Sequence, residues 1–551
     1  MENKNHKVNI AVIGAGALGL VAIKNLLEEG FNVTGFERKS YVGGLWKYTP
    51  DGTTSVLKTT FTNISKERSC FTDFPFPDDT PSLCSWTNVY AYLESYADHF
   101  GLRPHIRLNT AVKRVTRNDK NDKWTVEYAS TEDAVSQTQD FDKLVMATGI
   151  NQSPHIPKIE GIDSFAGTVL HSQAFKRPED FTGKTVVVVG IGNTAADTAV
   201  ALIGHAKKIY ISHRHGAYIL PRKRNGRSID HNLSYRLFTV QGVLERLAPS
   251  LSEKLLNKFI AKLQNEAFPA ICQPQGAKWH LWPPVSIRQS VPTVTDELVP
   301  ALEQGRIESV AGIKSVGKHT VHLDDDDDDD NDDGTAATLD DVDTIIFCTG
   351  YISDLGTALL EPHVNPVRNT SPAWLAATGS RGKPLPRLYR NVFSLDYPQS
   401  LVFMGAASFP TPAFQLYDQA SMAVAQIWGG RSSLPSQAEM EQAVDTHHSW
   451  MVGLAKRGPV YPGLVRSHEW LAWADKAAGT GVGANLGWGW QGWRFWLTQH
   501  RFYKLLTTGV YSPHLYRVFS GSGTKRKAWA GAREAIEQMN QRLATEEPKT
   551  K

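Results

Sequence analysis

The hydrophobic and polar positions of the chain repeat one arrangement twice, over residues 8–37 and again over residues 185–214. Each copy begins with a short apolar run, passes through a glycine-rich turn, continues with apolar residues at helical spacing, and ends in a second apolar run. Short apolar runs bounded by turns are typical of buried strands, whereas the stretch between them has the period of an amphipathic helix. The pattern therefore predicts two strand–helix–strand units, each with a parallel pair of strands.

The turn of the first unit has the spacing G-x-G-x-x-G. Gly14 allows the tight turn, Gly16 allows a pyrophosphate to approach the backbone, and Gly19 allows the helix to pack closely on the strand. The N-terminus of the helix adds partial positive charge. Glu37 ends the second strand, 23 residues after Gly14, where a carboxylate can accept hydrogen bonds from a ribose diol. The first unit is therefore predicted to bind a dinucleotide with a free ribose diol, such as FAD.

The second unit differs from the first at the end of its second strand. Its turn has Gly190, Gly192 and Ala195 at the three positions, and alanine is acceptable at the third. Where the first unit has an acid, the second has serine, histidine and arginine. An arginine binds a 2′-phosphate that a carboxylate would repel, although it could also be an ordinary surface charge. We expect NADP to contact Gly190, Gly192, Asn193, Ser212 and Arg214.

Two further apolar strands, at residues 142–150 and 343–351, end in a Thr-Gly turn and place the domain boundaries. They predict an α/β fold with two Rossmann-like dinucleotide-binding domains, the NADP domain being inserted into a discontinuous FAD domain. A helical, aromatic C-terminal cap follows. The expected boundaries are residues 1–170 for the first FAD segment, 171–340 for the NADP domain with a substrate-access insertion at about 218–300, 341–460 for the second FAD segment, and 461–551 for the cap.

Composition narrows the class of protein. A chain of 551 residues is too long for one hydrophobic core. Its 59 basic and 56 acidic residues give a net charge of +3 without a basic, aromatic stripe, so nucleic acid is not an expected partner. The four cysteines form no closely spaced pair, which argues against a zinc site and a redox-active disulfide. No signal peptide and no long apolar span are evident, so a cytoplasmic location is expected.

A motif between the two units resembles a known signature. Phe165, Gly167, His171 and Phe175 match F-x-G-x-x-x-H-x-x-x-[Y/F], the identifying sequence of the flavin-containing monooxygenases. Similar segments extend along nearly the whole chain, in family order: "FERKSYVGGLWKY", "TNISKERSCFTDFPFPDD", "SHRHGAYILPR", "IIFCTGY", "SPHLYRVF" and "KAWAGAREAI". The motif is expected to be a connector that works as a hinge between the two domains, with the histidine as a packing residue.

The resemblance implies an enzyme with FAD and NADPH as cofactors. It implies that O₂ adds to the reduced flavin, and that the resulting C4a-hydroperoxyflavin oxygenates the amine nitrogen or the sulfur of a small nucleophile. Baeyer-Villiger monooxygenases, which act on ketones, have tryptophan where this chain has Phe175, and this difference favours nitrogen or sulfur. Oxygenation of a ketone, and NADPH oxidation without oxygen insertion, remain as alternatives. The amino acid sequence leaves open whether the chain forms a homo-oligomer.

The same resemblance assigns site residues in the first unit. Asn63 matches the family asparagine near the flavin C4a position and is the expected catalytic residue, although an asparagine is also common in turns. Gly43, Gly44, Leu45 and Trp46 match a segment that runs along FAD. Arg38 is expected at the adenosine end. No metal ligands are predicted.

Two other segments have unusual composition. The acidic run at residues 324–333 is expected to be a mobile hairpin tip or loop, and its composition also permits calcium. The aromatic tail from about residue 460 has near-helical spacing, for which core packing is the favoured interpretation. Membrane contact, at most peripheral, is the alternative, since animal relatives are membrane-bound and this chain ends in the polar "NQRLATEEPKTK".

Overall fold

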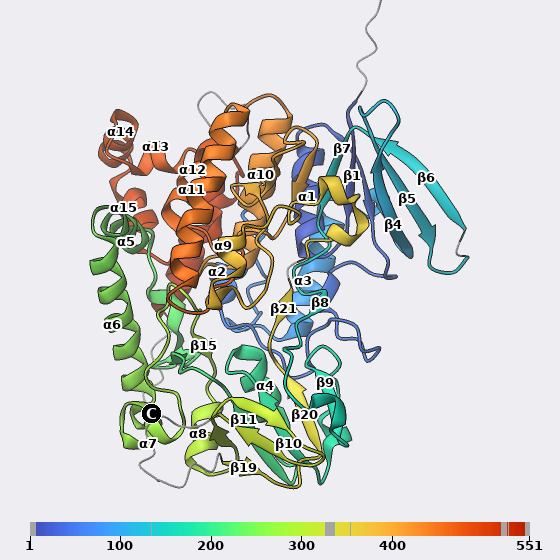
Figure 1. Cartoon of the computed structure of the whole chain (residues 1–551). Coiled ribbons are helices and arrows are strands. Elements are labelled where there is room, and N and C mark those ends of the chain that lie inside the picture. Colours follow the sequence, from blue (N-terminus) through green and yellow to red (C-terminus); the bar gives the residue numbers. More distant parts are fainter. Residues whose placement is uncertain are drawn as a thin grey trace, which may run out of the picture.

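The computed structural model describes residues 7–133, 135–324, 337–352, 354–519, 526 and 528–545. Two sheets, one mostly parallel and one wholly parallel, lie in separate parts of the molecule, and each has a glycine turn and a helix after one of its central strands (Figure 1). Helices from the C-terminal part of the chain and from the middle of the second unit form a layer along one side. The prediction of an α/β fold with two Rossmann-like units is confirmed.

The first sheet has seven strands in the order β22–β23–β24–β7–β1–β2–β3. The five strands from β24 to β3 in this order pair in parallel. At the other edge, β22 pairs antiparallel with β23, and β23 pairs antiparallel with β24. The inner parallel strands are mostly buried and rich in Val, Ile and Phe, as the sequence pattern requires, whereas the short edge strand β3 is partly exposed. The strands are β1 (Asn9–Ile13), β2 (Asn32–Phe36), β3 (Ile106–Arg107), β7 (Lys143–Met146), β22 (Leu388–Tyr389), β23 (Phe393–Ser394) and β24 (Leu401–Phe403).

Three helices cover the first sheet, and a smaller antiparallel sheet is attached to it. α1 follows the glycine turn and packs against α10, whose residues are almost all buried because it lies between α1 and the C-terminal helix α12 (Ser467–Ala478). The helices are α1 (Ala17–Glu28), α3 (Trp86–His99) and α10 (Ala413–Trp428), and the small sheet comprises β4 (Thr110–Arg117), β5 (Trp124–Ser130) and β6 (Ser136–Phe141).

The second sheet has five parallel strands in the order β16–β11–β10–β20–β9. They are β9 (Thr168–His171), β10 (Thr185–Val189), β11 (Lys208–Ser212), β16 (Glu308–Val310) and β20 (Thr344–Phe347), with α4 (Asn193–Ala201) after the turn and α8 (Leu298–Glu303) before β16. The expected boundary at 170/171 falls within β9, and the expected boundary at 340/341 falls just before β20. β9 and β20 both belong to this sheet, because their apolar side chains complete its core.

The family motif also lies in the second sheet, and this corrects its interpretation as a connector. β9 is its edge strand, Phe165 packs in the cluster on one face, and Phe175 packs against Phe181 on the other. Gly167 is required because an added Cβ would lie 2.3 Å from the carbonyl oxygen of Asp343. The true connections between the two sheets are β8 (Ser153–Pro154) and β21 (Tyr351–Ile352), which pair antiparallel.

The insertion in the second unit is mainly helical. α5 (Tyr235–Leu247) and α6 (Pro249–Ala267) run along the left edge of the view in Figure 1, and short elements join them to the sheet. These elements are β12 (Ile219–Leu220), β13 (Lys223–Arg224), β14 (Arg227–Ser228), α7 (Pro274–Lys278) and β15 (Thr293–Val294). A hairpin of β17 (Ile313–Val316) and β18 (Val321–Leu323) continues to β19 (Thr338–Leu339). Most of the acidic run lies between β18 and β19, and residues 325–336 are outside the described residues.

The C-terminal part is helical, and its aromatic residues do not all serve the core. The segments are α11 (Gln437–Ala455), α12 (Ser467–Ala478), α13 (Val482–Leu486), α14 (Trp490–Thr498), α15 (His500–Thr508) and α16 (Ala532–Thr545), with α2 (Lys66–Ser69) and α9 (Pro372–Leu375) elsewhere. Trp470 is buried, but Trp488, Trp490, Trp493 and Trp496 are exposed. Core packing, the favoured interpretation of this tail, is therefore wrong for these four tryptophans, although Phe495 of α14 packs against the core.

A buried ionic cluster joins the C-terminal part to α1. The Arg517 guanidinium, 1% exposed, lies 2.9 Å from Asp73 and 3.2 Å from Glu28. Lys24 contacts both acids as well. Burial disfavours the charge of Arg517, but the surrounding carboxylates outweigh it and raise the pKa of this arginine. Because these groups are removed from water, loss of one charge leaves the others uncompensated.

Candidate functional site

The glycine turn of the first unit has no room for side chains. Gly14 has φ +106°, and a Cβ on it would lie 2.5 Å from the carbonyl oxygen of Ala147. A Cβ on Gly19 would lie 1.8 Å from the carbonyl oxygen of Gly14. α1 begins after Gly16 with no side-chain cap and no acid in its first turn. Its N-terminal amides are therefore suited to a pyrophosphate, which fits the expected FAD.

Glu37 stands beside this turn at the end of β2. Its carboxylate is buried and accepts hydrogen bonds from the backbone N–H groups of Ala15 and Lys39, both at 2.9 Å. These bonds fix the acid against the glycine turn, where the sequence placed a ribose contact. Arg38 points elsewhere, and its guanidinium donates to Gln152 at 2.7 Å on the exposed connection between the sheets.

The Gly43–Trp46 segment lies against the glycine turn. Gly43 donates its N–H to the carbonyl of Ala15, and Gly43 and Gly44 both have positive φ. A Cβ on Gly44 would lie 3.0 Å from the Cα of Gly16. The two glycine segments therefore meet backbone to backbone, and such a surface can contact an extended cofactor closely.

The turn of the second unit is built in the same way but is more open. Gly190 has φ +127°, and a Cβ on it would lie 2.8 Å from the carbonyl oxygen of Cys348. A Cβ on Gly192 would meet nothing within 4 Å. α4 begins after Gly192 without a side-chain cap or an acid in its first turn. Asn193 is held by Val294, whose N–H donates to its Oδ1 at 2.7 Å. This N-terminus suits the pyrophosphate of a second dinucleotide.

The two remaining NADP candidates differ in exposure. Ser212 is fully buried and donates its hydroxyl to the carbonyl of Ala311 at 2.7 Å, so it is not presented to a ligand. Arg214 is exposed, and its Nε lies 3.8 Å from Oδ2 of Asp324, the first residue of the acidic run. Arg214 is thus the candidate that can reach a 2′-phosphate, with one carboxylate competing for its charge.

A cavity of about 470 Å³ brings the two units together. Its first wall comes from the flavin side and includes Leu45, Trp46 and Asn63. Its second wall comes from α4 and includes Asn193 and Asp197. The lining also includes apolar residues, namely Val56, Leu57, Phe61, Ile64, Phe76, Val89, Ala413 and Phe414, and polar residues, namely Thr54, Ser55, Thr60, Thr62, Ser69, Asn151, Ser172, Thr194, Thr198 and Tyr351. Residues far apart in the sequence therefore line one cavity, as the predicted pairing of two cofactors requires.

An ionic network borders this cavity and contacts Asn63. Arg222 donates from Nε to Asn63 Oδ1 at 3.2 Å, and its Nη atoms lie 2.9 Å from Glu297 and 3.3 Å from Asp197. Burial raises the pKa of the Asp197 carboxyl to about 6, although the nearby Arg222 lowers it. The Arg222 side chain thus contacts both walls of the cavity, Asn63 on the first and Asp197 on the second.

His171 of the family motif uses both of its ring nitrogens within the fold. Gln173 donates its backbone N–H to Nδ1 at 3.1 Å, so Nε2 carries the proton and donates to the carbonyl of Gly350 at 2.9 Å. The ring lies 5.0 Å from that of Tyr351. Burial lowers the pKa of His171, which favours the neutral imidazole. The residue therefore ties β9 to the connection that follows β20.

Comparison with known proteins identifies the family. The model of the FMO-like family, described as flavin-binding monooxygenase-like, matches residues 7–547. The chain belongs to this family. Monooxygenase aurF of Gibberella zeae is 43% identical over 532 residues, covering 96% of this chain and 97% of that protein. Flavin-containing monooxygenase 5 of Rattus norvegicus is 30% identical, covering 96% and 91%. The predicted family and the prediction of a flavin monooxygenase are confirmed.

Solved structures share the fold of this flavin-binding monooxygenase-like chain. The S-allyl-L-cysteine S-oxygenase of Allium sativum is 23% identical, with a TM-score of 0.60 over 86% of this chain and 88% of that one. The cyclohexanone monooxygenase of Rhodococcus sp. Phi1, bound to NADP⁺, is 17% identical, with a TM-score of 0.58 over 87% and 98%. Similar scores for an S-oxygenase and a cyclohexanone enzyme mean that the fold alone does not select the substrate.

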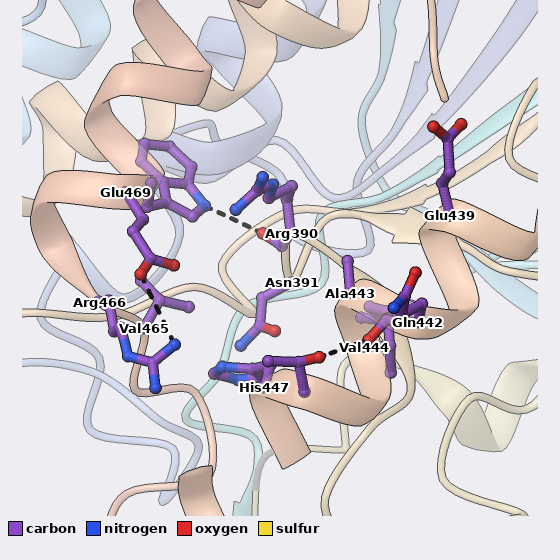
Figure 2. Close-up of a pocket in the computed structure, with 13 residues that line it drawn as sticks. Arg390, Asn391, Glu439, Gln442, Ala443, Val444, His447, Val465, Arg466 and Glu469 are labelled. Atoms are coloured by element: carbon purple, nitrogen blue, oxygen red, sulfur yellow. Dashed lines mark hydrogen bonds and ion pairs between the residues drawn. The ribbon is translucent and has the colours of Figure 1, made fainter. Parts of the chain in front are cut away.

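A second pocket, of about 300 Å³, lies between α11, the start of α12 and the turn from β22 to β23 (Figure 2). Trp470 donates to the carbonyl of Arg390, and the Asn391 amide donates to the carbonyls of Ala406 and Gly463. Burial, with His448, Arg466 and Arg390 nearby, lowers the pKa of His447 to about 3, so this imidazole is neutral. The pocket contains none of the predicted site residues.

Sequence reasoning did not single out Arg222, Asp197 or Phe414, although all three belong to the cavity or its border. Arg222 ends the family-like segment "SHRHGAYILPR", which was the one available signal. Asp197 lies on α4 with the spacing of an ordinary helix residue. Phe414 comes from α10, which no local pattern connects to the flavin side.

Proposed function

We propose that this flavin monooxygenase uses FAD, NADPH and O₂ to oxygenate the nitrogen of an amine or the sulfur of a thiol or thioether. The observation that carries the proposal is the cavity of about 470 Å³, in which Leu45, Trp46 and Asn63 face Asn193 and Asp197. A cofactor on the first glycine turn and one on the second would both border this space. The substrate, a small molecule, would bind in the same cavity.

Different residues of the chain are proposed to bind the two cofactors. Gly14, Gly16 and Gly19, with Glu37 and the segment Gly43–Trp46, would hold FAD. Gly190, Gly192 and Asn193 would hold the pyrophosphate of NADPH, and Arg214 its 2′-phosphate. When bound, these cofactors supply hydride transfer and activation of O₂.

Asn63 is proposed to act as a positioned amide at the flavin end of the cavity. Its oxygen is occupied by Arg222, which fixes the rotation of the amide, so the NH₂ group is left to donate toward the reacting atoms. Apolar side chains form part of the lining around it, and a donor in a partly desolvated environment stabilises developing negative charge more strongly than in bulk solvent.

The preference for nitrogen or sulfur rests on two points. Dimethylaniline monooxygenase [N-oxide-forming] 4 of Rattus norvegicus is 34% identical to this chain, with 62% of this chain covered. Phe175 replaces the tryptophan of the Baeyer-Villiger enzymes, but it is buried beside Phe181 and does not line the cavity, so its influence would act through packing. Oxygenation of a ketone is therefore retained as the second candidate, because a cyclohexanone enzyme shares the fold.

The test uses the purified holoenzyme with NADPH and ¹⁸O₂. N,N-dimethylaniline, methyl phenyl sulfide and cyclohexanone are offered separately, and products are identified by mass spectrometry. A labelled N-oxide or sulfoxide supports the proposal, whereas a labelled lactone alone would move the assignment to ketone oxygenation. Stoichiometric H₂O₂ with no labelled product from any substrate would assign an NADPH oxidase instead.

A further inference from the structure

The segment that carries Asn63 is anchored by the insertion of the second unit. Ser65, two residues after Asn63, immediately precedes α2 and is fully buried. It donates two hydrogen bonds to Oδ2 of Asp230, from its backbone N–H at 3.0 Å and from its hydroxyl at 3.1 Å. Asp230 is only 6% exposed and lies 165 residues further along the chain. The start of α2 is therefore held by a carboxylate that comes from another part of the fold.

The Asp230 carboxylate is itself fixed, and it also faces a buried cation. Its Oδ1 accepts a hydrogen bond from the Ser228 hydroxyl at 2.7 Å, so the turn before it sets its orientation. Its Oδ2 lies 3.9 Å from Nη1 of Arg68, which belongs to α2 and is 3% exposed. Burial lowers the pKa of Arg68, and the Asp230 carboxylate opposes this effect. Removal of the carboxylate would therefore leave both the Ser65 N–H and the Arg68 charge without this partner.

A second contact between α2 and the insertion lies next to the first. Glu67 of α2 accepts hydrogen bonds from His231 Nε2 at 3.1 Å and from the Ser82 hydroxyl at 2.8 Å. The Glu67 and His231 side chains are both 8% exposed. Burial disfavours the charge of Glu67, but hydrogen bonds, first of all the one from His231, outweigh it and lower the pKa of its carboxyl. Two consecutive residues of the insertion, Asp230 and His231, thus hold α2.

Asn63 depends on this anchor because its own side chain has few contacts. In the part of the chain that the structure describes, its only side-chain hydrogen bond is the one from Arg222, at 3.2 Å. The backbone of Asn63 reaches α2 through Ile64 and Ser65, so a shift of Ser65 would move the amide within the cavity. The insertion, which the sequence led us to expect at the substrate approach, therefore also supports the flavin side of the cavity.

We propose that Asp230 is a positioning residue for Asn63: by holding Ser65 and Arg68, it keeps the Asn63 amide directed into the cavity. The inference rests on the proposed function, in which that amide donates toward the reacting atoms. A displacement of about 1 Å can lower a rate roughly 100-fold, so a fixed backbone at this point has a direct consequence for oxygenation. Asp230 does not line the cavity and acts through the segment that it holds.

The position of the segment is measured by amide hydrogen exchange of the holoenzyme, read by mass spectrometry in peptides that cover residues 61–71. Asp230→Ala leaves the Ser65 N–H without its acceptor, so exchange in these peptides should become about tenfold faster. Asp230→Asn keeps an oxygen acceptor and loses only the charge, so the increase should be smaller. If Asp230→Ala does not fold with FAD bound, Asp230→Asn is the variant that decides.

Glu245→Gln is the matched control for loss of a buried acid of the insertion. Glu245 belongs to α5, is 13% exposed, and has Arg288 at 3.5 Å and His468 at 3.3 Å as its partners. Its substitution should destabilise the insertion without touching the Asn63 segment. Exchange of residues 61–71 should therefore remain as in the unmodified enzyme.

The consequence for the reaction is measured as oxygenated product and H₂O₂ formed per NADPH, with methyl phenyl sulfide as substrate. In Asp230→Ala the rate of product formation should fall about 10- to 100-fold, with H₂O₂ accounting for the NADPH that forms no product. Flavin content and the rate at which NADPH bleaches the flavin should stay near those of the unmodified enzyme, and Glu245→Gln should keep the unmodified ratio of product to H₂O₂. Because Asp230 acts through Asn63, adding Asp230→Ala to Asn63→Ala should lower product formation by less than about twofold more.

The proposal is overturned if exchange of residues 61–71 is unchanged in the Asp230 variants, or if Glu245→Gln speeds it equally. Faster exchange with an unchanged ratio of product to H₂O₂ would also overturn it, because Asp230 would then be purely structural. Effects that multiply in the double variant would overturn it as well, since Asp230 would act independently of Asn63. Failure of the unmodified enzyme to form any oxygenated product would instead refute the proposed function, and the exchange measurements would still show whether Asp230 holds the segment.

Discussion

The contact between Asn63 and Arg222 allows one prediction to be worked out in detail. Asn63→Ala removes the acceptor of a hydrogen bond of 3.2 Å from a charged donor that is 9% exposed. Hydrogen bonds to charged groups contribute about 1.5–3 kcal/mol. Because Arg222 keeps Glu297 and Asp197 as partners, we expect a loss of free energy of unfolding at the lower end of this range. The substitution also removes the amide donor from the cavity.

Two further variants separate the position of the amide from its donor function. Asn63→Asp keeps an acceptor for Arg222 but has no N–H to donate, whereas Arg222→Met keeps the amide and removes the group that orients it. If donation matters, Asn63→Ala and Asn63→Asp should both oxidise NADPH mainly with reduction of O₂ to H₂O₂ and little oxygenated product, and Arg222→Met should release less H₂O₂ per NADPH than they do. A double-mutant cycle between Asn63→Ala and Arg222→Met should give a coupling of about 1 kcal/mol or more.

The assay compares NADPH consumed, oxygenated product formed and H₂O₂ released for each variant. Flavin content and the rate at which NADPH bleaches the flavin are the controls, and both should remain near those of the unmodified enzyme for the Asn63 variants. The reasoning fails if Asn63→Ala yields as much product per NADPH as the unmodified enzyme. A coupling energy near zero would separately refute the Arg222 contact.

Three other predictions follow from buried or charged groups. Arg517→Met should lower the free energy of unfolding by about 3–5 kcal/mol in urea titrations, because it leaves buried carboxylates uncompensated, whereas the exposed control Arg177→Met should change it by less than about 1 kcal/mol. The raised pKa of Asp197 stabilises the fold fully only below the ordinary aspartate pKa, and this contribution is lost as the pH rises through about 6. Compared with Asp197→Asn, the unmodified protein should therefore lose about 1.4 kcal/mol of its free energy of unfolding between about pH 5 and about pH 7.5. If the two proteins differ in free energy of unfolding by the same amount at both pH values, the pKa shift is contradicted. Arg214→Ala should raise the KM for NADPH by about one to three orders of magnitude without raising that for NADH, while Asp324→Asn should lower the KM for NADPH up to about fivefold in steady-state assays. Equal use of both nucleotides by the unmodified enzyme would refute this account of Arg214.

The glycine turns were predictable because their residue spacing is local in the sequence. Only part of the steric constraint is local, since a Cβ on Gly19 would collide with the carbonyl of Gly14, whereas Cβ atoms on Gly14 and Gly190 would collide with carbonyls of residues more than 130 positions away. The family motif was recognised by the same kind of spacing. Its place was not predicted, because pairing of β9 with β20 joins segments more than 170 residues apart, and local periodicity carries no information on such pairing.

The amino acid sequence by itself determined the two dinucleotide units, their different charge at the end of the second strand, and the family. Tertiary structure alone decided that Asn63 meets Arg222, that Asp197 borders the same cavity, and that Trp490 faces solvent. The physical reason is that an apolar residue at helical spacing has the same local pattern whether a neighbour covers it or not. Only the packing of distant helices determines which face is covered and which polar groups are brought together.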